Sequence, residues 1–104
     1  MMRPRDFAIV VACVAATSCA QAGDRARDLT SLVREDCGSC HGMTLKGGLG
    51  AALTPQDLAD KDVLSLAAII LDGVPGTPMP PWRGLITEAD ARWIAEHLKQ
   101  GFPK

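Results

Sequence analysis

Two cysteines and a histidine stand together near the middle of the chain, in the run Cys37-Gly38-Ser39-Cys40-His41. Side chains three residues apart are neighbours on one helical turn, and the histidine follows the second cysteine directly. This pattern is typical of covalent haem attachment, in which two thiols bond to the two vinyl groups of a c-type haem and the histidine ligates the iron. The motif therefore predicts a fold built around one covalently bound haem c per chain.

The size and composition of the chain are consistent with a cofactor in its core. The 104 residues include two Trp, two Phe and no Tyr, so few large side chains are available to fill an interior. Exported domains of this size usually need disulfides, a metal or a cofactor for stability. The net charge is −1 and no cluster of Lys and Arg is visible, which does not favour a nucleic-acid partner.

Residues 1–22 have the pattern of a cleavable export signal. Arg3 and Arg5 precede an apolar run over residues 7–19, and Ala20-Gln21-Ala22 fits a small-residue cleavage site. The run is too short to span a bilayer, so we expect no stable membrane insertion after cleavage. An uncleaved anchor and lipidation at Cys19 are the alternatives. The expected product is one exported domain, residues 23–104.

Cleavage would also leave the mature domain with Cys37 and Cys40 as its cysteines. A thioredoxin-like dithiol needs a strand before its helix, and no strand pattern is visible. A zinc site needs four ligands, and the mature chain offers only these two cysteines with His41 and His97, at unfavourable spacing. These two alternatives and a chance match are disfavoured. We expect no functional role for His97, which we place on a solvated helix face.

The apolar periodicity and the capping residues predict an all-α domain of three to four helices. The expected helices run from about Arg25 into Asp36, from Thr54-Pro55 to about Lys61, from the cap Asp62 to the terminator Gly73, and from Glu88 to Gln100 after the cap Thr87. Several glycines after His41 predict an irregular loop in which backbone can approach a ligand closely.

Met79 is the predicted second axial ligand of the iron. It lies in Gly76-Thr77-Pro78-Met79-Pro80-Pro81-Trp82, where prolines on both sides stiffen the loop. Met43 is the competitor, but it follows His41 by two residues and cannot readily reach the opposite face of the ring. The predicted cofactor-binding residues are Cys37, Cys40, His41 and Met79, of which His41 and Met79 ligate the metal.

These features together resemble class I cytochromes c. More narrowly, the run Cys-Gly-Ser-Cys-His-Gly-Met-Thr-Leu-Lys-Gly-Gly from Cys37, with Pro-Gly-Thr-Pro-Met-Pro-Pro-Trp from Pro75, is similar to the small cytochrome c-55X of denitrifying bacteria. The resemblance implies a periplasmic electron carrier, not an enzyme, that receives electrons from an upstream donor and passes them to haem cd1 nitrite reductase. A role in haem d1 maturation is its alternative. A haem-based ligand sensor is a third hypothesis.

One position departs from the class I pattern, and two further roles, a propionate contact and an edge for electron transfer, are hypotheses. Class I cytochromes usually have Gly-Pro after the haem loop, with a carbonyl that accepts a hydrogen bond from the histidine, whereas this chain has Gly50-Ala51. Trp82 and Arg83 are placed to meet a haem propionate. We expect electrons to pass at the haem edge near three small or apolar residues: Gly42, Met43 and Pro78.

Overall fold

A computed structural model describes residues 23–102 of the chain. The predicted signal over residues 1–22, with Cys19, lies outside the described residues. Residues 23–31 and residues 32–102 belong to two compact units. No helix within residues 23–102 is long and apolar enough to cross a membrane.

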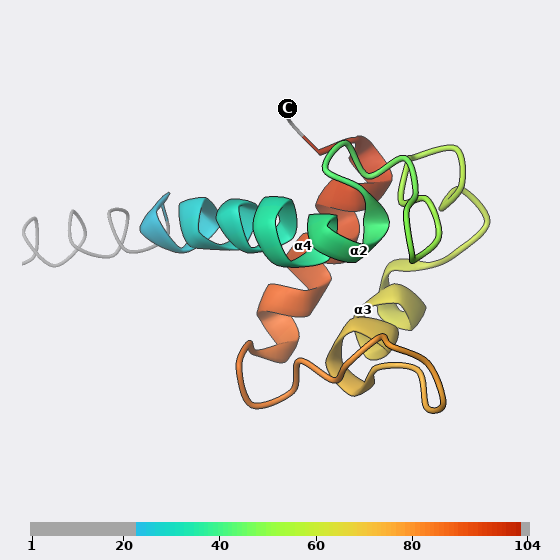
Figure 1. The fold of residues 1–104 in the computed structure, drawn as a ribbon. Helices are drawn as coiled ribbons and strands as arrows, with labels where there is room; N and C mark the ends of the chain where they lie inside the picture. Colours follow the sequence, from blue (N-terminus) through green and yellow to red (C-terminus); the bar gives the residue numbers. More distant parts are fainter. Residues whose placement is uncertain (1–22, 103–104) are drawn as a thin grey trace, which may run out of the picture. The chain divides into compact units, whose positions relative to one another are not determined.

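The backbone before and through the Cys37–His41 motif is helical. Residues 23–32 are α-helical, η1 (Val33–Cys37) is a π-helical turn, and α2 (Gly38–His41) returns to the α conformation. The wide turn arises because the N–H of Gly38 donates to the carbonyl of Val33, five residues back. The expected end of this helix near Asp36 was therefore wrong, because the helical backbone continues as far as His41 (Figure 1).

The helix expected from Thr54-Pro55 to Lys61 does not form, and a run of turns takes its place. The cap itself is present, since Thr54 Oγ1 accepts from the N–H of Asp57 at 3.3 Å. The N–H of Leu58 donates to the Thr54 carbonyl, but the N–H of Lys61 turns back three residues to Leu58. A segment this short gains too few hydrogen bonds to offset the cost of starting a helix.

The helix α3 (Val63–Asp72) has the expected ends. Asp62 caps it by accepting from the N–H of Ser65 at 2.8 Å. Gly73 ends it at φ +69°, and its N–H donates to the carbonyl of Ile69. Leu66, Ala67 and Leu71 are its buried side chains.

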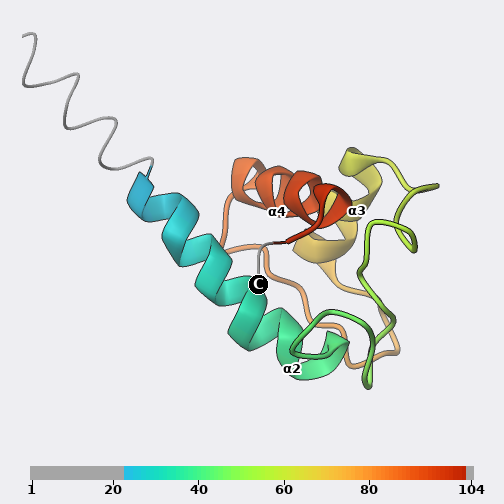
Figure 2. The same ribbon diagram turned by 90° about the horizontal axis from the view of Figure 1, so that it is seen from above.

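The last helix, α4 (Glu88–Gln100), begins with the predicted capping box. Thr87 Oγ1 accepts from the N–H of Asp90, whose carboxylate accepts from the N–H of Thr87. Figure 2 shows α4 beside α3, and the two helices pack together. The buried side chains of α4 are Asp90, Ala91, Ile94, Ala95 and Leu98.

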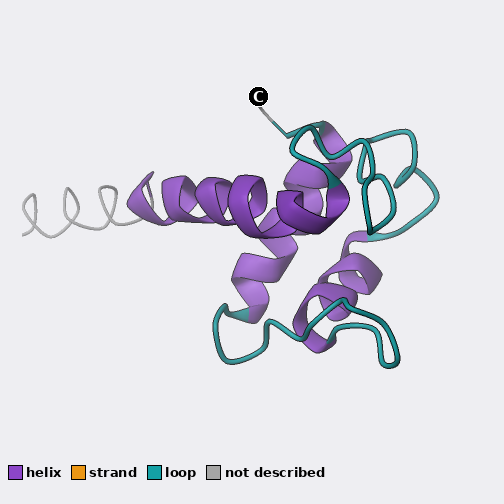
Figure 3. Cartoon of the chain, in the orientation of Figure 1, coloured by secondary structure: helices purple, strands orange, loops and turns teal. Residues whose placement is uncertain are grey.

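Loops connect these helices, and no strand occurs between residues 23 and 102 (Figure 3). Lys99 closes one of the loops against α4, because its ammonium group donates to the carbonyls of Leu58 and Lys61. The long-range contact fixes the turns over residues 55–60 without a helix there. The loops that follow α2 and α3 contact or carry the remaining parts of the candidate site.

We predict that Thr87→Ala lowers the free energy of unfolding by about 1 kcal/mol, because the N–H of Asp90 loses its side-chain partner. Chemical denaturation of the purified protein measures the change. Gln100→Ala, at the exposed last position of the same helix, is the control and should leave the stability unchanged. Equal losses for both variants would contradict the assignment of the cap.

Candidate functional site

The two cysteines and the histidine lie within one and a half helical turns at the junction of η1 and α2. Cys37 ends η1, while Cys40 and His41 are the last residues of α2. All three side chains are half-buried, and both cysteines are free thiols. The structure thus brings together the three residues of the predicted attachment motif.

The environment of Cys37 does not suit a dithiol redox site. Burial raises the pKa of the Cys37 thiol to about 11, and the negative charge of Asp36 adds to the effect. A redox-active cysteine of a Cys-x-x-Cys motif needs a lowered thiol pKa.

Within residues 23–102, no three His, Cys, Asp or Glu side chains gather closely enough to hold a metal ion.

The imidazole of His41 is oriented by a backbone carbonyl. Its Nδ1 lies 2.7 Å from the oxygen of Ala51. Because a carbonyl only accepts hydrogen bonds, Nδ1 must carry the proton, which leaves the lone pair of Nε2 available to a metal. The carbonyl expected in the Gly-Pro of class I cytochromes is therefore supplied here by Ala51.

Gly50 packs directly against the ring of His41. A Cβ at this position would lie 2.7 Å from Cε1 and 2.8 Å from Nδ1 of the imidazole, closer than side-chain carbons are found. The N–H of Gly50 also donates to the carbonyl of Cys40 at 2.7 Å, and the N–H of Gly47 donates to that of His41 at 2.8 Å. The glycine loop thus folds back on the end of α2 and encloses the histidine, a use of Gly50 that the sequence did not reveal.

Met79 lies on a separate loop after α3 and shares no hydrogen bond with the Cys37–His41 segment in the described chain. The loop is closed by its own hydrogen bonds. The N–H of Val74 donates to the Met79 carbonyl at 3.2 Å, Thr77 Oγ1 donates to the Val74 carbonyl at 2.7 Å, and the N–H of Met79 donates to Thr77 Oγ1 at 3.3 Å. Together with Pro78 and Pro80, these bonds hold a half-buried methionine in a stiff turn.

The segment after Met79 is anchored to the end of α3. The N–H groups of Trp82 and Arg83 donate to the carbonyls of Ile70 and Leu71, at 3.2 and 2.9 Å. Carbonyls in the last turn of a helix have no partner within the helix, so this anchor satisfies two of them. Gly73 permits the approach, since a Cβ there would lie 2.7 Å from the Met79 carbonyl oxygen.

The side chains present fit a covalently bound haem. Cys37 and Cys40 are free, half-buried and on one helical turn, as thioether attachment requires. His41 has an Nε2 that can ligate iron, because its Nδ1 donates to Ala51. Met79 offers a thioether sulfur on a stiff loop. The residues present could thus supply one histidine and one methionine ligand to a haem iron.

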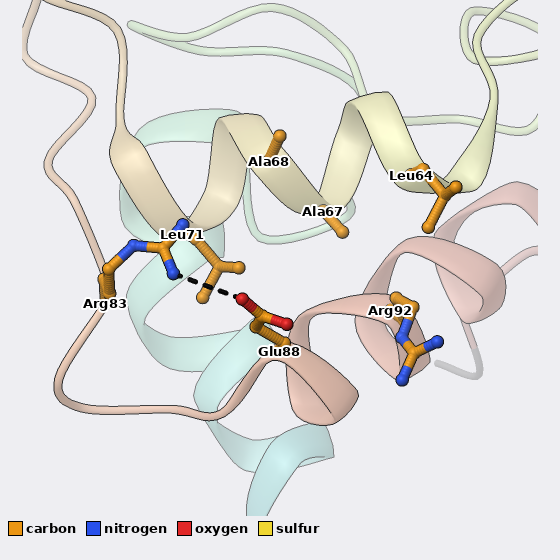
Figure 4. A pocket seen from close by; sticks show the side chains of 7 residues that line it. All are labelled: Leu64, Ala67, Ala68, Leu71, Arg83, Glu88 and Arg92. Carbon is orange, nitrogen blue, oxygen red and sulfur yellow. Dashed lines mark hydrogen bonds and ion pairs between the residues drawn. The ribbon is translucent and has the colours of Figure 1, made fainter.

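The guanidinium of Arg83, for which the sequence suggested a propionate contact, is bound by two carboxylates in the structure. It binds Asp72 through two hydrogen bonds, of 2.8 and 3.1 Å, and its Nη1 lies 3.5 Å from Glu88 Oε1. Figure 4 shows Arg83 and Glu88 at one end of a groove between α3 and α4, with Arg92 on the other side. Arg83 thus belongs to an ion cluster that joins two helices.

The remaining candidates lie as follows. Met43 is 72% exposed and lines a cavity of about 510 Å³ with Val33, Leu45 and Phe102 among its walls. His97 is half-buried rather than solvated, because its ring stacks on Trp93 with centroids 3.8 Å apart and its Nδ1 lies 2.7 Å from the Trp93 carbonyl. The expectation of a solvated face at His97 was therefore wrong.

Comparisons with known proteins point in one direction. A family model described as cytochrome C oxidase, cbb3-type, subunit III matches residues 24–98. Cytochrome c55X of Paracoccus denitrificans is 53% identical over 94 residues, which cover 88% of this chain and 91% of that protein. Among solved structures, the c-type cytochrome NirC matches with a TM-score of 0.73 and 51% identity, over 74% of this chain and 91% of NirC.

A larger protein contains a similar segment. The dihydro-haem d1 dehydrogenase of Pseudomonas aeruginosa is 33% identical over 85 residues. The match covers 82% of this chain but 17% of the dehydrogenase. The similarity therefore concerns one small part of that enzyme.

Gly50→Ala is predicted to displace the imidazole of His41, because the new methyl group would overlap the ring. We expect a loss of about 1–3 kcal/mol in unfolding free energy and a change in the haem spectrum. Gly84→Ala is the spectral control, since a Cβ there meets no atom within 4 Å and the cost of its positive φ, which Gly50 does not share, falls on the local backbone. Its spectrum should stay that of the wild type, and an unchanged Gly50→Ala spectrum would contradict the contact.

Ala51→Pro is predicted to leave the optical spectrum low-spin, because proline keeps the carbonyl that accepts from His41 Nδ1. The fixed φ should raise the free energy of unfolding by about 0.4–1 kcal/mol through a less flexible unfolded chain. Absorption spectra and denaturation curves measure the two effects. Loss of the Met79 ligand in this variant would contradict the prediction.

Proposed function

We propose that this chain, which belongs to the cytochrome c55X family of c-type cytochromes, carries one covalently bound haem c and transfers single electrons in the periplasm. Its fold is the all-α fold of class I cytochromes c, as the likeness to NirC shows. The proposed mature form is residues 23–104, after removal of the signal over residues 1–22. Haem cd1 nitrite reductase is the proposed electron acceptor.

The observation that carries the proposal is the hydrogen bond between His41 Nδ1 and the Ala51 carbonyl. It fixes the tautomer in which Nε2 can ligate iron, and it stands beside two free cysteines at the spacing for thioether bonds. A histidine held in this tautomer directly after two free cysteines has the arrangement that covalent haem attachment needs.

The chain's own residues divide the work of holding the cofactor. Cys37 and Cys40 would attach the ring, and His41 and Met79 would ligate its iron. A haem bound in this way supplies one reversible electron, at a potential that a thioether ligand raises relative to a second histidine. The hydrogen-bonded loops around His41 and Met79 keep both ligands in place, so little of the protein has to reorganise when an electron passes.

The proposed partner rests on the family. The two runs around Cys37 and Met79 resemble the cytochromes c-55X of denitrifying bacteria, which are encoded with haem cd1 nitrite reductase. The match to a cytochrome c55X extends over nearly the whole chain. Met43 is well exposed, which is consistent with a docking surface at the haem edge near Gly42 and Pro78.

A role in haem d1 maturation is the second candidate function. The observation that favours it is the similarity of this chain to a segment of a dihydro-haem d1 dehydrogenase. A domain shared with an enzyme that acts on a d1 haem can serve the same sequence of reactions as a separate electron carrier.

Purified protein from the periplasm is predicted to exceed the mass of residues 23–104 by one haem. The oxidised protein should show a sulfur-to-iron charge-transfer band in the near infrared, and the ferrous protein should not bind carbon monoxide. Met79→Ala should abolish the band and open the iron to carbon monoxide, while Met43→Ala, the control, should change neither. Carbon monoxide binding by the wild type would favour a ligand sensor instead.

Deletion of the gene separates the two proposed roles. If the chain is an electron donor, the nitrite reductase of the deletion strain should contain its full d1 haem but turn over slowly. If the chain serves maturation, the reductase should lack d1 haem, which its absorption spectrum reports. A complete reductase with normal turnover in cells would contradict both roles.

A further inference from the structure

We propose that Arg83 is a positioning residue that ties the Met79 loop to α3 and α4 and so keeps Met79 on the iron. The inference rests on the proposed function and deepens it, because it concerns what holds the proposed iron ligand Met79 in position. It replaces a propionate contact of Arg83 with a structural role, and it depends on the ion cluster formed by Arg83, Asp72 and Glu88.

The geometry of the cluster is that of a clamp. Nε and Nη2 of Arg83 bind the two carboxylate oxygens of Asp72 side by side, at 2.8 and 3.1 Å. Such a paired arrangement fixes the direction of both side chains as well as their distance. Asp72 is the last residue of α3, and Glu88, 3.5 Å from Nη1, is the first residue of α4. One guanidinium therefore links the segment after Met79 to the ends of two helices.

Movement at Arg83 would be transmitted to Met79. Only Pro80, Pro81 and Trp82 separate the two residues, and both prolines have a fixed φ. The backbone N–H of Arg83 donates to the Leu71 carbonyl, so main chain and side chain hold the same point. Because the connection is short and stiff, an anchor at residue 83 limits where the methionine sulfur can go.

The charges in the groove support this assignment. Asp72 has a pKa below its ordinary value, chiefly because Arg83 donates hydrogen bonds to the carboxylate. The pair is about half exposed on each side, which makes it sensitive to salt. Arg92 lines the same groove, but nothing in the described part of the chain gives it a hydrogen bond or an ion pair (Figure 4). The groove thus contains one clamping arginine and one that can serve as its control.

The expected consequence is a shift between two states, with Met79 on or off the iron. Imidazole added to the oxidised protein can occupy only the position that Met79 leaves, so its apparent affinity measures the fraction in the off state. Weakening the clamp should enlarge this fraction without changing the site itself. For a paired but exposed ion cluster we expect an increase of about three- to five-fold.

The test is a titration of the holoprotein with imidazole. Loss of the sulfur-to-iron charge-transfer band measures how much imidazole has bound. Arg83→Gln and Asp72→Asn should each raise the apparent affinity for imidazole about three- to five-fold. The double variant should bind imidazole no more tightly than either single variant, because the two side chains act through one interaction. Arg83→Lys should have an affinity for imidazole between those of the wild type and Arg83→Gln, since it keeps the charge but not the paired hydrogen bonds.

Arg92→Gln is the matched control and should bind imidazole as the wild type does. Hydrogen exchange of the amides from Thr77 to Arg83 gives a second readout, which should speed up in Arg83→Gln but not in Arg92→Gln. Equal imidazole affinities in the wild type and Arg83→Gln, or additive effects in the double variant, would overturn the inference alone. A wild-type protein without the charge-transfer band would overturn the Met79 ligation on which it rests.

Discussion

Carbonyl groups at the ends of two helices organise the functional part of this small domain. Helix ends leave carbonyls without intrahelical partners, and here the loops that follow α2 and α3 return to supply N–H donors. Gly47 and Gly50 bind the carbonyls of His41 and Cys40, while Trp82 and Arg83 bind those of α3. Each proposed axial ligand therefore lies beside a helix end that its own loop has closed.

The same arrangement explains how a domain with so few aromatic residues can present two ligands. Its core of aliphatic side chains, most of them from α3 and α4, is modest, and no disulfide joins the two cysteines. Backbone hydrogen bonds hold the loops, where larger proteins would use packing. A covalently attached ring would add the apolar surface that the sequence lacks and would join the end of α2 to the loop after α3 through one iron.

Much of this structure was predictable because its signals are local. The caps Asp62 and Thr87 and the terminator Gly73 each act within a few residues, and the structure confirms the ends of α3 and α4 that they define. Two expectations failed for different reasons. The turns near Leu58 depend on Lys99, about forty residues away, which local signals do not report. The stacking of His97 on Trp93 joins residues four apart on α4, a local pair that the polar neighbours of His97 obscured. The partners of Arg83 were missed because Asp72 looked like any exposed helical acid.

The two backbone groups around His41 have a consequence for the ring as a whole. With Gly50 against one edge and the Ala51 carbonyl holding Nδ1, the imidazole cannot turn over about its bond to Cβ without breaking a contact or a hydrogen bond. The polypeptide therefore sets the plane of the imidazole without a metal. An iron bound to Nε2 would have one fixed orientation of this ligand, and Gly50 and Ala51 would thereby determine the asymmetry of its electronic environment.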